Sequence, residues 1–366
     1  MPDRIWLATD APGRSLPVMP LLAELTPEVA AGRELSAAEV QRIAAALAGP
    51  EETEADKGAF LTALARRGET AAEVAAFAVA FRDRARDPGL GEWSGRAIDI
   101  VGTGGDHSGG FNVSSVVVLV LASAGVPVIK HGNRGITSRC GSADLLAGLG
   151  VDIEAGEERL RGALRELGFA FLFAPAYHPA FRLIAPVRRA LAQQGQRTVF
   201  NILGPLINPG RPAQALVGTF SPALVPILAG ALEALGTRAG LVVHGTIAPA
   251  RGIDELTTAT ENLVRGVGAR RDVAGMWRAV DFGLEPAPFA DLAGGDLAEN
   301  LARVESLLEG RAPRGLEDTV VLNAATGLWL TGRVDSVRAG LEPARDLLRG
   351  GAVRRKLTAV REFFRS

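Results

Sequence analysis

The chain has 366 residues, 47% of them hydrophobic and 22% charged, and its 40 basic and 41 acidic residues leave a formal net charge of −1. The length predicts one large domain with a smaller companion, and the apolar content excludes disorder over most of the chain. The charge balance argues against a surface built mainly for nucleic acid, so no nucleic-acid partner is expected.

The single cysteine, Cys140, excludes an intrachain disulfide and fits a reducing cytoplasm. The first residues lack the pattern of a signal peptide. No apolar stretch reaches about 18 residues without charges or helix breakers, so neither a membrane span nor a membrane partner is expected. The composition therefore predicts a soluble, cytoplasmic protein.

The first part of the chain is predicted to be helical. Residues 1–17 contain three prolines and no periodicity, and we expect an extended arm there. Residues 18–90 repeat apolar side chains at helical spacing, and Ser36 followed by Glu39 forms a capping box that starts a helix. They predict a small all-helical domain, on which helices from about residues 175–195 are expected to pack.

In residues 91–366 the sequence pattern changes, and predicted strands alternate with predicted helices. Short buried strands are predicted at 98–101, 126–129, 169–173, 215–220 and 241–243. Helices are predicted between them and again at 297–310, 318–331 and 334–365. This order predicts an α/β domain with a central, largely parallel sheet flanked by helices, and sites in such sheets form where loops leave the carboxyl ends of the strands.

The first candidate site is the glycine-rich turn 102–106, directly after the strand 98–101. Its glycines allow backbone N–H groups to surround an anion, and Ser114 or Ser115 starts the following apolar helix, where the helix dipole favours a phosphate. Taken alone, the turn fits an ordinary strand-to-helix connection as well.

A second loop strengthens the phosphate interpretation. Lys130, His131, Asn133 and Arg134 follow the strand 126–129, and residues 138–142 precede the next helix. A solvated basic turn is the plain alternative. So many cations and hydroxyls at one strand end are costly unless an anion compensates them.

Adjacent carboxylates at Asp254 and Glu255, in the loop expected after 241–243, are suited to Mg²⁺, which takes oxygen ligands and bridges phosphates. Such a pair is often plain surface. Asn, Gly and Pro at high density in 201–209 predict a rigid loop. The spacing of the four histidines matches no zinc signature, and the sequence has neither a nucleophile elbow nor a Walker loop.

Taken in order, these segments resemble the anthranilate phosphoribosyltransferase family of tryptophan biosynthesis, from about residue 20 to the C-terminus. The resemblance rests on 99–106, 111–115, 130–134, 141–144, 173–180, 198–209, 244–245 and 252–255. It implies a helical domain beside an α/β domain, an active site between them, and a homodimer formed largely through the small domain. The reaction it implies transfers ribose 5-phosphate from phosphoribosyl diphosphate (PRPP) to the amine of anthranilate and releases diphosphate.

The resemblance also assigns roles to residues, with Mg²⁺ as the cofactor. It implies PRPP binding by Gly102, Thr103, Gly104, Gly105, Asp106, Asn112, Ser114, Ser115, Lys130 and Ser142. It implies anthranilate binding by Gly102, His131, Asn133, His178 and Arg188, with Arg188 facing the carboxylate, and metal binding by Ser114, Asp254 and Glu255. Lys130 is expected to stabilise the transition state, and no residue is expected to act as a general acid or base.

The chain departs from the family pattern in four places. His107 and Gly110 replace the usual Gly and Thr beside the glycine turn. The segment at 192–195 is longer by about three residues, which could shift Arg188, and the segment 246–251 is longer by about four. Thr258-Ala259-Thr260 replaces the usual Gly-Pro-Thr after the acidic pair.

Three alternatives stay open at this stage. A paralogue would use the same donor with another aromatic acceptor. A pyrimidine nucleoside phosphorylase shares the fold but normally carries Lys-His-Ser where this chain has Lys130-His131-Gly132. A non-enzymatic nucleic-acid-binding relative would lose the glycine turn and carry a basic surface, and this chain shows neither feature.

Overall fold

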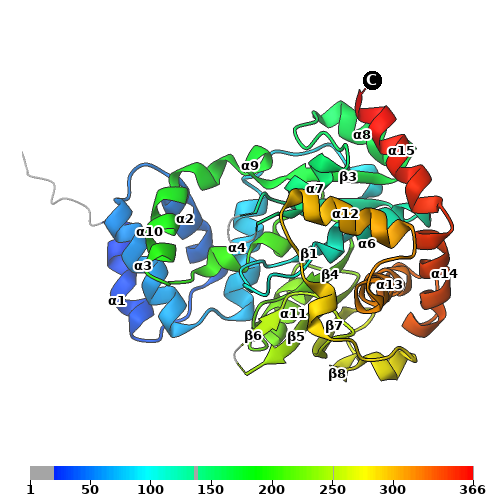
Figure 1. Ribbon diagram of the computed structural model, residues 1–366. Helices are drawn as coiled ribbons and strands as arrows, with labels where there is room; N and C mark the ends of the chain where they lie inside the picture. The colour runs from blue at the N-terminus through cyan, green and yellow to red at the C-terminus, as the bar shows by residue number, and fades with distance from the viewer. Residues whose placement is uncertain (1–19, 136–138, 250, 366) are drawn as a thin grey trace, which may run out of the picture.

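The computed structural model describes residues 20–135, 139–249 and 251–365 (Figure 1). The predicted arm at 1–17 lies outside the described residues, as does Ser138 of the second loop. None of the helices in the described part combines the length and hydropathy that a membrane crossing needs.

Four helices open the chain and form a bundle, seen at the left of Figure 1: α1 (Leu21–Ala30), α2 (Ala37–Ala48), α3 (Glu54–Arg67) and α4 (Ala71–Arg82). The capping box predicted at Ser36 and Glu39 is present at the start of α2, and Thr70 with Glu73 repeats it at α4. These caps satisfy the first N–H groups of each helix and fix where it begins.

A later segment of the chain returns to this bundle. Helix α10 (Ala185–Gln193) packs on α3, and η1 (Pro179–Leu183) contacts α2. Val187 and Leu191 of α10 share a hydrophobic cluster with α3, and the same cluster continues to Val217 on the sheet. One continuous core therefore fixes the bundle against the sheet.

The larger unit is built on an eight-stranded sheet with the order β3-β2-β1-β4-β5-β7-β8, and β6 pairs with β5 off this path. The strands are β1 (Ile98–Gly102), β2 (Val128–Gly132), β3 (Phe169–Phe173), β4 (Gln214–Gly218), β5 (Ala239–Ala248), β6 (Arg251–Ile253), β7 (Glu261–Gly268) and β8 (Ala274–Trp277). The five strands from β3 to β5 are parallel. The predicted fold class, a helical domain plus an α/β domain with a largely parallel sheet, is confirmed.

Helices cover both faces of the sheet. One face carries α6 (Val113–Ser123), α13 (Arg314–Leu330), α14 (Val337–Arg349) and α15 (Ala352–Arg365), and the other carries α11 (Leu224–Ala234). Helix α6 is buried from Val113 to Ala122, because its apolar residues run all round the helix. The remaining helices are α5 (Gly91–Ser94), α7 (Ser142–Gly148), α8 (Glu157–Leu167), α9 (Ala174–Tyr177) and α12 (Leu297–Leu308).

The structure differs from the expected elements in three places. Residues 244–253 are not the loop predicted after 241–243, because β5 continues to Ala248 and turns back into the antiparallel strand β6. The antiparallel strands β7 and β8 were not predicted. The predicted helix 334–365 is two helices, α14 and α15, separated at Gly350 and Gly351.

The strand order places a switch point beside β1. The chain runs from β1 to β2 and β3 on one side, and then returns to β4 on the other side of β1. Loops that leave the carboxyl ends of β1 and β4 therefore diverge, and this divergence opens the crevice in which open α/β sheets bind ligands.

Candidate active site

The glycine turn after β1 lies against the acidic pair that follows β6. Gly104 donates its N–H to the Asp254 Oδ2 atom at 2.7 Å. A Cβ atom at Gly102 would overlap the same carboxylate, and one at Gly218 on β4 would overlap the Asp254 carbonyl. Glycine at both strand ends is therefore what allows Asp254 to sit across the switch point.

Beyond Gly104, the turn presents a row of free donors. Within the described residues, the N–H groups of Gly105, Asp106 and His107 donate to no protein acceptor. Gly104, Gly105 and His107 have φ values of 68, 71 and 53°, the left-handed region in which successive N–H groups turn to the same side. Such a row is an anion-binding concavity.

His107 is the only one of these residues that carries a side chain in the left-handed region. The family pattern has glycine there, and His107 keeps the glycine-like backbone conformation. The cost for a residue with a Cβ atom is about 1–2 kcal/mol. The substitution therefore changes the loop's strain but not its course.

Two further contacts tie this loop to its surroundings. Thr103 donates its N–H to the Gly218 carbonyl at 3.0 Å, and its Oγ1 accepts the Phe220 N–H at 3.2 Å. On the outer side, the Arg197 guanidinium donates to the Gly105 carbonyl at 2.7 Å. Sequence reasoning assigned no role to Arg197 or Phe220.

The start of α6 meets the second loop at Lys130. The Lys130 ammonium is 1% exposed and donates to the Ile100 carbonyl at 2.6 Å and to the Ser114 Oγ at 3.1 Å. The Ser114 N–H donates to the Glu255 Oε1 at 3.3 Å. Three residues predicted for PRPP or metal binding thus form one connected cluster.

The carboxyl groups of this cluster repel one another. Burial, and then the neighbouring Asp106, raise the pKa of Asp254, while burial and Asp254 raise the pKa of Glu255. Burial lowers the pKa of Lys130, and Asp99, Glu255 and Asp254 oppose that change. Crowded carboxylates of this kind are stabilised by an added cation.

The donor set fits Mg²⁺ bound together with a phosphate ligand. Among the described residues, no group of three or more His, Cys, Asp or Glu side chains is arranged to hold a metal ion by itself. Mg²⁺ typically binds through one or two carboxylates and completes its shell with phosphate oxygens and water. Asp254 and Glu255 supply the first part of such a shell.

Asp99 supports both strand ends from within the core. One of its carboxylate oxygens accepts the Asn208 Nδ2 at 2.8 Å, and the other lies 3.4 Å from the His131 N–H. Burial raises the pKa of Asp99 to about 6. Asn208, from the rigid loop predicted at 201–209, also donates to the Ile129 carbonyl and so fixes β2 beside β1.

Asn112 joins the first loop to the second. Its Nδ2 donates to the Cys140 carbonyl at 3.1 Å, and its Oδ1 accepts the Nδ2 of Asn300 at 3.2 Å. Asn300, on α12, is 1% exposed and was not predicted from the sequence. Its contacts hold Asn112 in one orientation.

Other predicted residues lie near this cluster without joining it. Ser142 Oγ donates to the Asn133 carbonyl at 3.4 Å at the start of α7, and the Asn133 side chain accepts the Arg134 N–H. Ser115 is fully buried, and its Oγ has no hydrogen-bond partner in the described structure. Within the described residues, Asn133 makes hydrogen bonds with Ser142 and not with His131 or His178.

The basic loop needs less external compensation than its sequence suggested. Arg134 pairs with Asp144 at 3.0 Å, and Arg139 pairs with Glu299 at 3.4 Å. Carboxylates of the chain itself therefore compensate these two arginines. Lys130 remains the loop's cation within the cluster.

An aromatic cluster follows on the other side of Lys130. His131 and His178 meet edge to face at 5.1 Å, and His178 stacks on Phe181 at 5.3 Å. The Arg188 guanidinium lies 5.4 Å from the centre of the Phe200 ring and 6.0 Å from that of Phe181. No carboxylate of the described chain pairs with Arg188, and burial lowers its pKa.

Both histidines are neutral at pH 7. Burial lowers the pKa of His131 to about 4 and that of His178 to about 3. The His131 Nδ1 faces the Gly204 carbonyl at 3.1 Å, so this nitrogen carries the proton. The Nε2 atoms of both rings have no partner within the described chain, and that of His131 is left as a hydrogen-bond acceptor.

The longer segments are accommodated away from these side chains. Helix α10 ends at Gln193, and Gly195 follows it with a φ of 70°, while the Arg188 guanidinium, about one turn before the end of the helix, lies 5.4 Å from the centre of the Phe200 ring. Of the lengthened segment, residues 246–248 belong to β5 and Arg251 begins β6, and Gly245 pairs with Ile253 just before Asp254.

The replacement turn after the acidic pair is largely buried, and the Asn262 side chain makes several of its hydrogen bonds. Asn262 accepts the Thr257 N–H at 2.9 Å and donates to the carbonyls of Thr257, Thr260 and Trp277. Thr258 and Thr260 are 2% and 9% exposed. The turn is thus built into the core, and this fixes the backbone that follows Asp254 and Glu255.

Comparison with known proteins agrees with this arrangement. Residues 94–354 match the a/b domain of a glycosyl transferase family, and residues 23–85 match its helical bundle domain. The chain is therefore a two-domain glycosyl transferase. It is 42% identical over 271 residues to the anthranilate phosphoribosyltransferase of Synechococcus elongatus, a match that covers 74% of this chain and 75% of that protein. The chain belongs to the anthranilate phosphoribosyltransferase family, as its motifs predicted.

Solved structures extend the likeness to the whole fold. The anthranilate phosphoribosyltransferase of Thermus thermophilus superposes with a TM-score of 0.83 at 41% identity, covering 95% of this chain and 100% of that one. The Saccharomyces cerevisiae enzyme in complex with PRPP and Mg superposes with a TM-score of 0.81 at 25% identity, covering 95% and 99%.

Proposed function

We propose that this protein transfers the ribose 5-phosphate group of PRPP to the amine of anthranilate and releases diphosphate. The observation that carries the proposal is the row of N–H groups at Gly105, Asp106 and His107, which follow the carboxyl end of β1 at the switch point and have no acceptor among the described residues. The names of the relatives supply the identity of donor and acceptor.

The donor side is assigned to the residues around these N–H groups. PRPP is bound by Gly102, Thr103, Gly104, Gly105, Asp106, Asn112, Ser114, Ser115, Lys130 and Ser142. Backbone N–H groups need no reorganisation when negative charge grows on the departing diphosphate. Lys130 adds a positive charge held in place by Ile100 and Ser114.

Mg²⁺ is assigned to Asp254, Glu255 and Ser114. Asp254 is hydrogen-bonded to Gly104, and Ser114 is hydrogen-bonded to both Glu255 and Lys130. When bound, the ion supplies positive charge to the diphosphate oxygens. The yeast relative crystallised with PRPP and Mg supports this assignment.

The acceptor side is assigned to Gly102, His131, Asn133, His178 and Arg188. The Arg188 guanidinium is charged, lies over the Phe181 and Phe200 rings, and has no ion pair in the described chain. It is therefore suited to bind a planar carboxylate. The His131 Nε2 is an acceptor at neutral pH and is suited to orient an aromatic amine. Orientation alone accounts for a large share of the barrier in such transfers.

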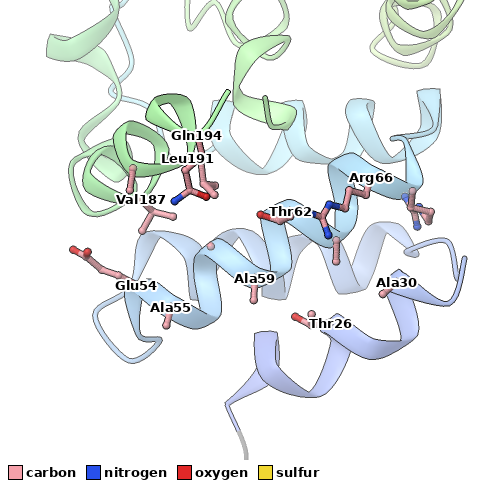
Figure 2. Close-up of a pocket in the computed structure, with 14 residues that line it drawn as sticks. Thr26, Ala30, Glu54, Ala55, Ala59, Thr62, Arg66, Val187, Leu191 and Gln194 are labelled. Atoms are coloured by element: carbon pink, nitrogen blue, oxygen red, sulfur yellow. The ribbon is translucent and has the colours of Figure 1, made fainter. Parts of the chain in front are cut away.

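We also propose that the protein is a homodimer formed through the helical bundle. A cavity of about 800 Å³ lies between α1, α3 and α10 (Figure 2). Figure 2 shows Thr26 and Ala30 on α1 and Ala55, Ala59 and Thr62 on α3 facing it. Small side chains there leave room for a helix of a second copy. Ala59→Arg should convert a dimer to a monomer in light scattering, and an unchanged mass would contradict this interface.

A cytoplasmic location is proposed from the single cysteine.

The reaction is tested by following anthranilate fluorescence with PRPP and Mg²⁺. We expect turnover in the wild type and its loss in Asp254→Asn/Glu255→Gln. Glu342→Gln, on α14 and exposed, serves as the control and should keep full activity.

Other outcomes separate the alternatives. Thermal stabilisation by PRPP without anthranilate turnover would select a paralogue with another aromatic acceptor. Binding of single-stranded DNA at physiological salt, together with no response to PRPP, would overturn the enzyme assignment.

A further inference from the structure

Arg197 stands where three parts of the site meet. It follows α10, which carries Arg188, and precedes η2 (Val199–Asn201), which supplies Phe200. Its guanidinium reaches the glycine turn and donates to the Gly105 carbonyl at 2.7 Å. No role in donor or acceptor binding follows from the motifs for this residue.

The guanidinium is held in place by an aromatic ring. The Arg197 Cζ lies 3.6 Å from the centre of the Phe220 ring, the shortest contact between a guanidinium and an aromatic ring among the described residues. Phe220 is itself fixed, because its N–H donates to the Thr103 Oγ1 at 3.2 Å. A stacked, planar guanidinium is pre-organised to donate in one direction, which a lysine side chain is not.

The bond to Gly105 fixes a peptide plane of the turn. In a trans peptide, the carbonyl of one residue and the N–H of the next point in opposite directions. By holding the Gly105 carbonyl, Arg197 aims the Asp106 N–H away from itself, and this N–H is one of the three without a protein acceptor in the described residues.

Charge adds to this geometry. Burial lowers the pKa of Arg197, and the nearby Asp106 carboxylate opposes that change. Arg197 therefore brings a positive charge to the glycine turn through its bond to the Gly105 carbonyl.

We infer that Arg197 is a positioning residue for PRPP: stacked on Phe220, it fixes the Gly105–Asp106 peptide so that the turn presents its N–H groups to the diphosphate. This inference rests on the proposed donor site. It predicts that Arg197 acts on donor binding and that Arg188, on the preceding helix, acts on acceptor binding.

The test measures PRPP affinity by calorimetry, in the presence of Mg²⁺ and without acceptor, for the wild type and three variants. Arg197→Met should weaken PRPP binding at least tenfold, while the melting temperature of the unliganded protein stays within about 2 °C, as expected for an exposed side chain. Arg197→Lys should recover only part of the affinity, because it keeps the charge and loses the stacked fork. Phe220→Leu should weaken binding in the same direction, by less than Arg197→Met.

Arg271→Met is the matched control. Arg271 is also exposed and also donates to a glycine carbonyl, that of Gly268, but at the end of β7. It should bind PRPP like the wild type. In steady-state assays, Arg197→Met should raise the KM for PRPP and leave the KM for anthranilate within twofold.

Two results would overturn the inference. One is PRPP affinity in Arg197→Met within twofold of the wild type. The other is a lower melting temperature of the unliganded variant with unchanged PRPP affinity, which a purely structural role would produce. Failure of the wild type itself to bind PRPP would instead overturn the proposed function.

Discussion

The Oδ2 atom of Asp254 accepts the N–H of Gly104 at 2.7 Å, across 150 residues of chain. This bond joins the glycine turn after β1 to the acidic pair after β6. It uses the Gly104 N–H for the protein's own carboxylate, while the N–H groups of Gly105, Asp106 and His107, without an acceptor among the described residues, remain for a ligand. The acidic pair thus helps to shape the anion cradle as well as to offer metal ligands.

Gly102→Ala tests whether this approach of Asp254 to the turn is required. A Cβ atom at position 102 would overlap the Asp254 carboxylate and displace it. We expect at least a tenfold loss of PRPP affinity, measured by calorimetry with Mg²⁺. Gly95→Ala is the control, because a Cβ atom there meets nothing within 4 Å, and it should bind normally. Equal affinities for Gly102→Ala and the wild type would show that the carboxylate can move without consequence.

His107→Gly tests the strain left by the departure at this position. Glycine adopts the φ of 53° without a steric penalty, so the free energy of unfolding should rise by about 1 kcal/mol. Gly104→Ala is the reverse experiment: nothing lies within 4 Å of its Cβ position and φ is 68°, so the free energy of unfolding should fall by about 1 kcal/mol through backbone strain alone. Urea unfolding measures both, and a loss of stability in His107→Gly would mean that the histidine side chain makes a contact that outweighs the strain.

The parallel strands could be predicted because each is a short, mainly apolar run. Strand β7 could not be predicted, because it contains Gly266 and Gly268 and buries Asn262. Asn262 is stabilised there by hydrogen bonds to three backbone carbonyls, which only the folded chain brings close to it. Propensity counts such residues against a strand. Tertiary hydrogen bonding outweighs that preference here.

The site divides in the same way. The glycine turn, Lys130 and the acidic pair are local signals, and the structure brings them together. Arg197 and Asn300 carry no local signal, because Arg197 depends on Phe220, 23 positions away, and Asn300 on Asn112, 188 residues earlier. The role of such a residue depends on the side chain or backbone group that it contacts, and only the fold determines which group that is.

The buried histidines should make stability depend on pH. The folded-state pKa values of His131 and His178, about 4 and about 3, lie below the unfolded value of about 6.5. The folded state therefore binds fewer protons, so stability is present above pH 6.5 and is lost as the pH falls. When the pH falls from 7.5 to 5.5, each histidine should lower the free energy of unfolding by about 1.4 kcal/mol.

The His178→Phe variant isolates one of these contributions. Phenylalanine keeps the stacking on Phe181 and removes the protonation site. The loss of unfolding free energy between pH 7.5 and 5.5 should be smaller than in the wild type by about 1.4 kcal/mol. Urea titrations at the two pH values measure it, and comparison with the wild type cancels other groups such as Asp99. The same pH dependence in both proteins would show that His178 is not held neutral.

Arg188→Met tests the acceptor side separately from the donor side. The Arg188 guanidinium lies over Phe181 and Phe200 with no carboxylate of the described chain as partner, so a substrate carboxylate is its natural ion pair. A hydrogen bond to a charged group is worth about 1.5–3 kcal/mol, which corresponds to at least a tenfold rise in the KM for anthranilate. The PRPP affinity should stay within twofold. Arg189→Met, at the exposed neighbouring position on α10, should leave both values unchanged. A rise in the KM for PRPP instead would assign Arg188 to donor binding and contradict the proposal that Arg188 acts on the acceptor and Arg197 on the donor.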